Sequence, residues 1–187
     1  KATVTAVLDA TAQILARDGY AGVTTNHIVE AAGVSIGSLY EYFPNKQSII
    51  AAMLARELSK IADEVASSMR IALALPDQPR GGINYWMRSM MTSLDKRGRL
   101  LRVAMREVPF FWHIPEAHNL SETLQHIAQE GRRKSERVLH FDDPEADTYL
   151  LMTMCWSAIL QTVLYRPAHL SRERLTRTLV DMVLKLL

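Results

Sequence analysis

The chain has 187 residues, 48% of them hydrophobic and 22% charged, with a formal net charge of +2. This composition is ordinary for a soluble globular protein with a sizeable core. It does not by itself indicate a nucleic-acid binder, although a local basic patch needs no global excess of charge. The single cysteine, Cys155, excludes an intrachain disulfide framework and fits a reducing compartment, so we expect a cytoplasmic location.

The first helix is predicted from apolar residues that recur every three or four positions between Val4 and Leu15. Gly19 ends it, because glycine readily takes the left-handed conformation found after helices. Thr24 or Thr25 can cap a second helix through its hydroxyl group.

A short third helix follows after a tight turn. Gly33 ends the second helix, and the third begins near Ile36 and ends before Pro44, since the residue before a proline avoids the helical region. Two short helices joined by a glycine-containing turn are typical of a helix-turn-helix motif.

A long fourth helix is predicted from Asn45, a good cap, to about Leu73. The stretch "LPDQPRGG" at 75–82 is then the clearest loop of the chain. Because the helix is so long, we expect its beginning to pack with the first three helices and its end with the rest of the chain.

Helical periodicity continues to the end of the chain. We expect a helix from Ile83, a short one at 99–107, an interruption at the proline-flanked "VPFFWHIPE", and a further helix starting near Leu120. Asp143 caps a helix that runs to about Tyr165, and Ser171 caps the last one. The uncharged run 149–165 is shorter than the roughly 20 residues that span a bilayer, so we expect it to be buried in protein. No strand pattern occurs, so the predicted fold is all-α, with about nine helices.

The segment "GYAGVTTNHIVEAAGVSIGSLYEYFPNKQSII" closely resembles the N-terminal DNA-binding domain of TetR/AcrR-family transcriptional regulators. The resemblance covers about residues 5–55. It implies an all-helical homodimer with a helix-turn-helix domain at 1–46 and a ligand-binding and dimerisation domain at 47–187, linked by the helix from about 46 to 73. It also implies a regulator, most often a repressor, that leaves a palindromic operator when a small hydrophobic effector binds. No cofactor is expected.

In such a motif the third helix enters the major groove of double-stranded DNA. Gly37 lets the backbone approach closely, and short hydroxyl groups and phenols can reach phosphates or bases. We also expect phosphate contacts at the starts of the second and fourth helices. The predicted DNA-binding residues are Thr25, Ser35, Ile36, Gly37, Ser38, Tyr40, Tyr42 and Lys46.

Other residues of this segment favour structural positions. Val34, Leu39 and Phe43 are expected in the core of the three-helix domain, and Glu41 is expected to face away from the groove because an acid repels phosphate. Five basic and five acidic residues balance within 1–60. This low charge predicts modest affinity for each half-site and dependence on dimerisation.

In the second domain, bulky apolar side chains predict both an effector pocket and a dimer interface, and the same residue types also fill cores. The predicted ligand-binding residues are Trp86, Met90, Phe110, Phe111, Trp112, His113, Met152 and Trp156. The resemblance implies that the last two helices pair between subunits, with Tyr149, Leu160, Leu164, Leu175, Leu179 and Met182 at the dimer interface.

The sequence also bears on two other classes of function. An all-α enzyme is disfavoured, because the six histidines form no HExxH pattern and no nucleophile-elbow, Walker or dinucleotide motif occurs. One cysteine and dispersed histidines make no recognisable metal site. A DNA-binding protein without a small-molecule effector stays open, and a cavity in the second domain would distinguish the two.

Overall fold

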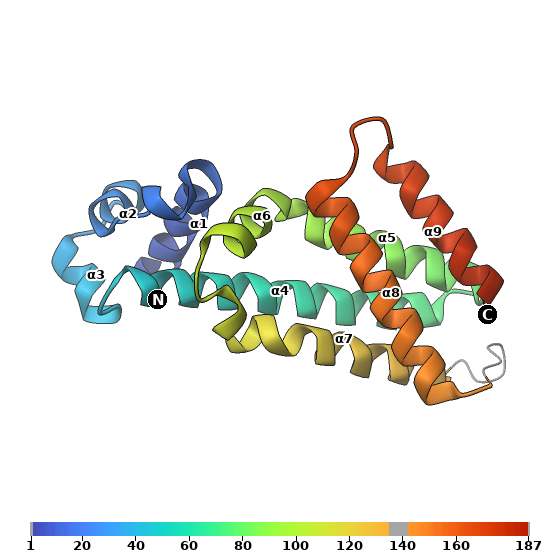
Figure 1. The fold of residues 1–187 in the computed structure, drawn as a ribbon. Coiled ribbons are helices and arrows are strands. Elements are labelled where there is room, and N and C mark those ends of the chain that lie inside the picture. The colour runs from blue at the N-terminus through green and yellow to red at the C-terminus, as the bar shows by residue number, and fades with distance from the viewer. Residues whose placement is uncertain (1, 135–141, 187) are drawn as a thin grey trace. The chain divides into compact units, whose positions relative to one another are not determined.

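A computed structural model describes residues 2–134 and 142–186. This part of the chain contains nine α-helices, one short 3-10 turn and no strand (Figure 1). The all-α prediction is therefore confirmed. Two compact units emerge: unit 1 comprises Lys1–Ser59 and Arg99–His118, and unit 2 comprises Lys60–Gly98 and Asn119–Leu187.

Unit 1 contains α1 (Ala2–Gly22), α2 (Thr25–Ala32), α3 (Ile36–Tyr42) and the beginning of α4 (Lys46–Ala74). It also contains most of α6 (Gly98–Glu107), the 3-10 turn η1 (Phe111–His113) and the beginning of α7 (Pro115–Lys134). Helices α1, α2 and α3 contact one another, and their apolar sides bury the core. The central core residues are Val7, Ile14, Leu15, Val23, Ile28, Leu39, Ile49, Ile50, Met53 and Leu54.

Two glycines shape the helical turns of unit 1. Gly33 has φ 65° and ψ 34°, a left-handed conformation that ends α2 as the sequence predicts. Gly19 has φ 75° and ψ 179°, a region that only glycine occupies readily, and it breaks α1. The helix resumes after this break and continues to Gly22, three residues beyond the predicted end.

Side-chain caps fix where the helices begin, and four of them lie where the sequence predicts. The Thr24 hydroxyl accepts from the His27 amide at 3.1 Å, and the Asn45 side chain accepts from the Ser48 amide at 2.9 Å. The expected caps at Asp143 and Ser171 also form, and Ser35 caps α3. Each satisfies an amide that has no partner within its helix.

Unit 2 contains α5 (Arg80–Lys96), α8 (Pro144–Tyr165) and α9 (Arg172–Leu186), with the later parts of α4 and α7. Helices α5, α8 and α9 pack against one another around Met87, Cys155, Val180 and Val183 (Figure 1). The expected loop at 75–82 is shorter than predicted. Helix α5 already starts at Arg80, so the glycine pair lies in its first turn.

Helix α8 is the one helix of the described residues with the length and apolar composition of a membrane span. Its Met152, Cys155 and Ile159 side chains are buried within unit 2, where they pack as a core helix would. The expectation that this run is buried holds for one side of the helix only, since Leu150 and Met154 are exposed.

The two units do not follow the predicted domain division at residue 46. Unit 1 extends along α4 to Ser59 and also takes in 99–118, a segment that the sequence analysis assigns to the ligand-binding domain. Contacts between residues far apart in sequence join this segment to unit 1: the backbone amide of Tyr20 donates to the Glu107 carboxylate at 3.0 Å, and the Tyr20 ring meets the Phe110 ring edge-on.

Candidate nucleic-acid interface and ligand cavity

Helix α3 presents an uncharged polar and aromatic face. Leu39 and Phe43 are buried and hold the helix against unit 1, which leaves the opposite side in solvent. There Tyr40 and Tyr42 are 51% and 52% exposed, and Ile36 is 42% exposed. Glu41 is exposed as well. Leu39 and Phe43 therefore lie in the core as the sequence predicts, whereas Val34, which was also expected there, is only half-buried.

The start of α3 can approach another molecule closely. A Cβ atom placed on Gly37 would meet only the Ser35 hydroxyl, at 3.8 Å, so the space beside this backbone is open. The Ser35 hydroxyl caps the helix and donates to the Ser38 hydroxyl at 2.9 Å. Since that bond uses the hydrogen of Ser35, the Ser38 hydroxyl keeps its own hydrogen for an external acceptor.

Lys46 is half-buried and has a partner within the chain. Its ammonium group lies 3.3 Å from the Tyr20 carbonyl oxygen and 4.3 Å from the centre of the Tyr20 ring. Thr25 is likewise half-buried, at the first position of α2. An ammonium group has three donors, so a lysine held in this way can still donate to a phosphate.

The charges of unit 1 cancel. Its sequence contains seven Lys or Arg residues and seven Asp or Glu residues. Arg17 is paired with Asp18 at 2.8 Å, and Arg56 is paired with Asp9 at 2.7 Å. The hydrogen bond from Arg17 lowers the pKa of the Asp18 carboxyl. Polar contacts and shape must therefore do more than a strong positive field in any recognition of DNA by this unit.

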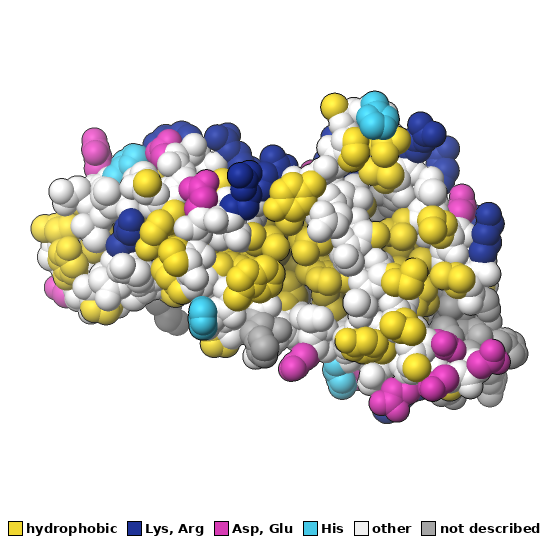
Figure 2. All heavy atoms as spheres, in the orientation of Figure 1, with side chains coloured by type: hydrophobic (Ala, Val, Ile, Leu, Met, Phe, Trp, Pro, Cys, Tyr) yellow, Lys and Arg dark blue, Asp and Glu magenta, His cyan; other side chains and the backbone are white. Residues whose placement is uncertain are grey.

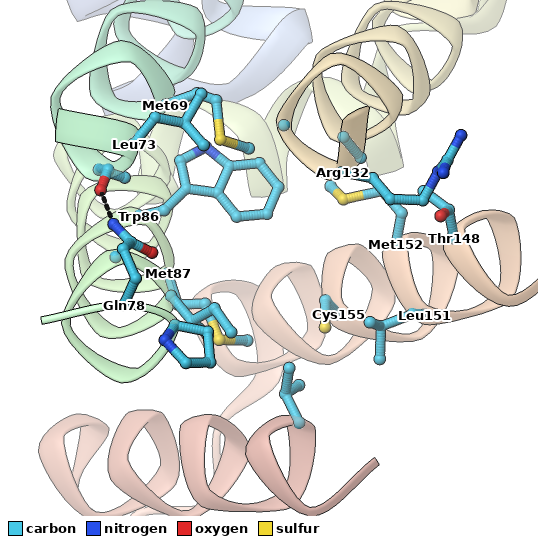
Figure 3. A pocket seen from close by; sticks show the side chains of 17 residues that line it. Met69, Leu73, Gln78, Trp86, Met87, Arg132, Thr148, Leu151, Met152 and Cys155 are labelled. Carbon is cyan, nitrogen blue, oxygen red and sulfur yellow. Dashed lines mark hydrogen bonds between the residues drawn. The ribbon is translucent and has the colours of Figure 1, made fainter. Parts of the chain in front are cut away.

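Unit 2 contains a partly open apolar cavity of about 120 Å³ between α4, α5, α7 and α8 (Figure 3). Met69 and Leu73 reach it from α4, Trp86 and Met87 from α5, and Leu151, Met152 and Cys155 from α8. Polar groups are few, and they include Gln78, Arg132 and Thr148. Burial raises the pKa of the Cys155 thiol to about 11.

The wall of the cavity is joined to the end of α4. The Gln78 side-chain amide donates to the Ala72 carbonyl at 2.6 Å (Figure 3) and also to the Leu75 carbonyl at 3.1 Å. These carbonyls lie where a helix runs out of amide partners. Gln78 therefore acts both as a cap of α4 and as part of the cavity lining.

The structure brings only two of the predicted ligand-binding residues, Trp86 and Met152, to this cavity. Met90 is buried elsewhere in the core, and Trp156 is half-buried outside the lining. The segment 110–113 belongs to unit 1, where Phe110 and His113 line a separate apolar hollow with alanines of α4. Within this segment Phe111 is buried and Trp112 is 60% exposed.

Helices α8 and α9 expose many apolar side chains, and Figure 2 shows hydrophobic side chains gathered over them. Six of the twelve large hydrophobic residues exposed in the described chain lie there: Tyr149, Leu150, Met154, Tyr165, Met182 and Leu186. Of the other predicted interface residues, Leu160, Leu175 and Leu179 are half-buried. Leu164 is enclosed by its own chain, because its side chain packs inside unit 2.

Within the described ranges, no group of three His, Cys, Asp or Glu side chains could hold a metal ion. His118 and His140 lie among the positions whose side chains are not described.

A model of the tetR family of bacterial regulatory proteins matches residues 7–53. Over 80% of this chain, the HTH-type transcriptional repressor KstR of Mycobacterium tuberculosis is 26% identical, with 69% of that protein covered. KstR of Mycolicibacterium smegmatis is 27% identical over 80% of this chain and 74% of its own length. Among solved structures, a TetR-family transcriptional regulator from Mesorhizobium loti aligns with a TM-score of 0.77 over 98% of this chain and 96% of its own, at 17% identity. In sequence over residues 7–53, and in fold over almost its whole length, the chain is similar to TetR-family transcriptional regulators.

The similarity in fold extends along almost the whole chain, although the match to the family model is confined to residues 7–53. The fatty acid degradation regulator FadR from Bacillus halodurans aligns with a TM-score of 0.72 over 97% of this chain and 94% of its own, at 16% identity. The matched residues 7–53 include α2, α3 and the exposed face of α3. The expectation that the chain is a regulator rather than an enzyme is confirmed.

Several residues that the structure brings together could not be predicted from the sequence. Met69, Gln78 and Arg132 line the cavity, but ordinary helix and loop patterns give no signal for them. Tyr20 and Glu107 pair across 87 positions, and only the fold brings them together.

Proposed function

We propose that this regulator is a repressor that binds a palindromic operator as a homodimer, and that a small hydrophobic effector in the unit 2 cavity releases it. The exposed face of α3, with a tight glycine and hydroxyl groups but few charges, is the observation that supports DNA recognition best. The repressors named KstR, similar over most of the chain, support repression. A DNA partner agrees with a cytoplasmic location.

Thr25, Ser35, Ile36, Gly37, Ser38, Tyr40, Tyr42 and Lys46 remain the proposed DNA contacts. Ile36 offers an apolar contact to a thymine methyl group, and Ser38 offers a donor to a base edge or phosphate. Tyr40 and Tyr42 donate to phosphates on either side. The amides at the start of α2 support a phosphate contact beside Thr25.

The exposed apolar face of α8 and α9 supports the proposed dimer. Single exposed hydrophobic residues are normal on any surface, but a contiguous set on neighbouring helices indicates an interface. Tyr149 and Met182 are its most exposed members among the residues predicted from sequence. Two copies of α3 would then read two half-sites about one helical turn of DNA, or a multiple of it, apart.

The size of the cavity supports a small effector. A dry apolar cavity of about 150 Å³ in another protein binds benzene, so the 120 Å³ found here suits a single ring or a short chain. Its walls of Met, Leu and Trp disfavour strongly polar ligands, because such a ligand would lose hydrogen bonds to water without replacing them. Arg132 and Thr148 are its polar anchors.

Helix α4 supports coupling between effector and DNA. Met69, Ala72 and Leu73 of this helix line the cavity, and the same unbroken helix begins at Lys46. A ligand that displaces these side chains acts on the helix that carries a proposed DNA contact. The effector changes operator affinity only by its differential affinity for the two states.

Selection of bound sequences from a random duplex library, at stated salt concentration, tests the DNA-binding proposal. Enrichment of a palindrome is expected, and failure of folded protein to enrich any sequence would refute it. Release of that operator by single-ring apolar compounds, such as ethylbenzene, then tests the effector proposal.

Two substitutions on α7 sharpen the effector test. Ala128→Leu fills the cavity and should abolish release. Thr123→Leu adds the same side chain at an exposed position of α7 and should leave release intact. If A128L and T123L respond equally to the compound, the effector does not occupy this cavity.

A further inference from the structure

Tyr20 is held at three points by residues of unit 1 that are distant in sequence. Its amide donates to the Glu107 carboxylate at 3.0 Å, and its ring meets Phe110 edge-on with 6.3 Å between ring centres. Its carbonyl oxygen accepts from the Lys46 ammonium group at 3.3 Å, and that ammonium also lies over its ring. Tyr20 therefore joins the end of α6 to the first residue of α4.

The contact with Glu107 is built into the backbone beside it. Gly19 breaks α1, so the next amide is satisfied from outside that helix. A Cβ atom on Gly19 would lie 2.5 Å from the Glu107 carboxylate oxygen, so any other residue here would push this side chain aside. The carboxylate can keep its bond to the Tyr20 amide because residue 19 is a glycine.

We propose that Glu107 is a positioning residue for DNA binding, acting through Tyr20 on Lys46. This inference rests on the proposed phosphate contact of Lys46. Among the described residues no carboxylate pairs with this ammonium group, which is placed by the Tyr20 carbonyl and ring. Tyr20 in turn is placed by Glu107. Without Glu107 the Tyr20 amide loses its acceptor. The Tyr20 carbonyl and ring, which place the Lys46 ammonium group, are then no longer held in a fixed position.

The position of Glu107 in the chain makes this contact a point of regulation. Glu107 is the last residue of α6, and α6 follows α5 after the single residue Arg97. Helix α5 contributes Trp86 and Met87 to the effector cavity. Arg97 itself is bound to Glu64 of α4 by two hydrogen bonds of 2.8 and 3.2 Å. A shift of α5 is thus transmitted along the chain to α6, and so to the acceptor of the Tyr20 amide.

A double-mutant cycle on the full chain tests the proposal, with operator affinity and its salt dependence as readouts. Lys46→Ala is expected to weaken operator binding and to lower the slope of log affinity against log salt concentration. Glu107→Ala is expected to weaken binding about five-fold, the equivalent of one modest hydrogen bond. Like K46A, it should also make the decrease of log affinity with log salt concentration less steep. The combined variant should bind no more weakly than K46A alone.

Glu107→Gln provides the matched control. Its side-chain oxygen still accepts from the Tyr20 amide while its charge is gone, so operator affinity should stay within about two-fold of the parent protein. A general effect of negative charge would instead make both Glu107 variants bind DNA more tightly. Thermal unfolding of each variant shows that the chain remains folded.

The outcomes separate this inference from the function it rests on. If K46A leaves affinity and slope unchanged, the phosphate contact of Lys46 is wrong, and the positioning role falls with it. If K46A weakens binding but E107A does not, or if the two effects add fully, Glu107 does not act through Lys46. Non-additive loss with rescue by E107Q is the supporting result.

Discussion

Gly19 and Gly33 offer a comparison of one substitution in two different surroundings. Both have positive φ, and alanine at either position must adopt a conformation that L-residues avoid. At Gly33 an added Cβ would meet nothing within 4 Å, so the substitution costs only the strain of the left-handed backbone conformation. Gly33→Ala should therefore lower the free energy of unfolding by about 1–2 kcal/mol.

Gly19→Ala should cost more. Its φ of 75° and ψ of 179° lie in a region that is essentially reserved for glycine and that costs other residues about 1–3 kcal/mol. In addition, the new methyl group would lie 2.5 Å from the Glu107 carboxylate oxygen, so this side chain must move and the bond to the Tyr20 amide is lost. That loss adds about 1 kcal/mol.

Equilibrium urea unfolding of the full chain measures both variants, provided that the m value is unchanged. The difference between G19A and G33A should shrink when Glu107→Ala is present in both, because the steric conflict and the hydrogen bond then no longer exist. Equal costs for the two glycines in the parent background, or a difference that E107A does not reduce, would refute the reasoning.

Three further predictions concern other parts of the chain. Tyr42→Phe should weaken binding to operator and to unrelated DNA by a similar factor, because a phosphate donor carries no sequence information; filter binding to both duplexes checks this. Arg97 holds the pKa of Glu64 below its ordinary value of 4.5, so this pair stabilises the fold above about pH 4.5 and its contribution is lost as pH falls through the lowered pKa. Arg97→Gln should therefore reduce the unfolding free energy at pH 7 by more than at pH 3, as urea titrations at the two pH values would reveal. Met182→Asp, at a side chain 55% exposed, should yield monomers in sedimentation experiments, whereas Arg177→Asp, also exposed on α9, is the charge control and should remain dimeric; dimeric M182D would argue against this interface.

The helix ends could be predicted from sequence because their causes are local. Thr24, Asn45, Asp143 and Ser171 satisfy amides two or three residues away, so the interaction lies within a short window of sequence. The exposed face of α3 could also be predicted from a short stretch of sequence. Leu39 and Phe43 mark the buried side by their spacing, and the polar residues between them then face solvent.

The cavity and the unit boundary could not be predicted in this way. Bulky apolar residues at 110–113 and at Trp86 look alike in sequence, but only the latter lines the cavity. What assigns 99–118 to unit 1 is a set of contacts such as that between Tyr20 and Glu107, across 87 positions. No short window contains that information, because it depends on which surfaces the helices bury together.

The raised pKa of the cavity thiol has a consequence for the kind of signal that the protein can sense. With a pKa of about 11, only about one Cys155 side chain in ten thousand is ionised at pH 7. Alkylating agents and peroxides react with thiolates, so this buried cysteine is protected from both. If a compound occupies the cavity as proposed, it would therefore be held by reversible fit, and the regulator would return to its starting state once the compound is metabolised or diluted.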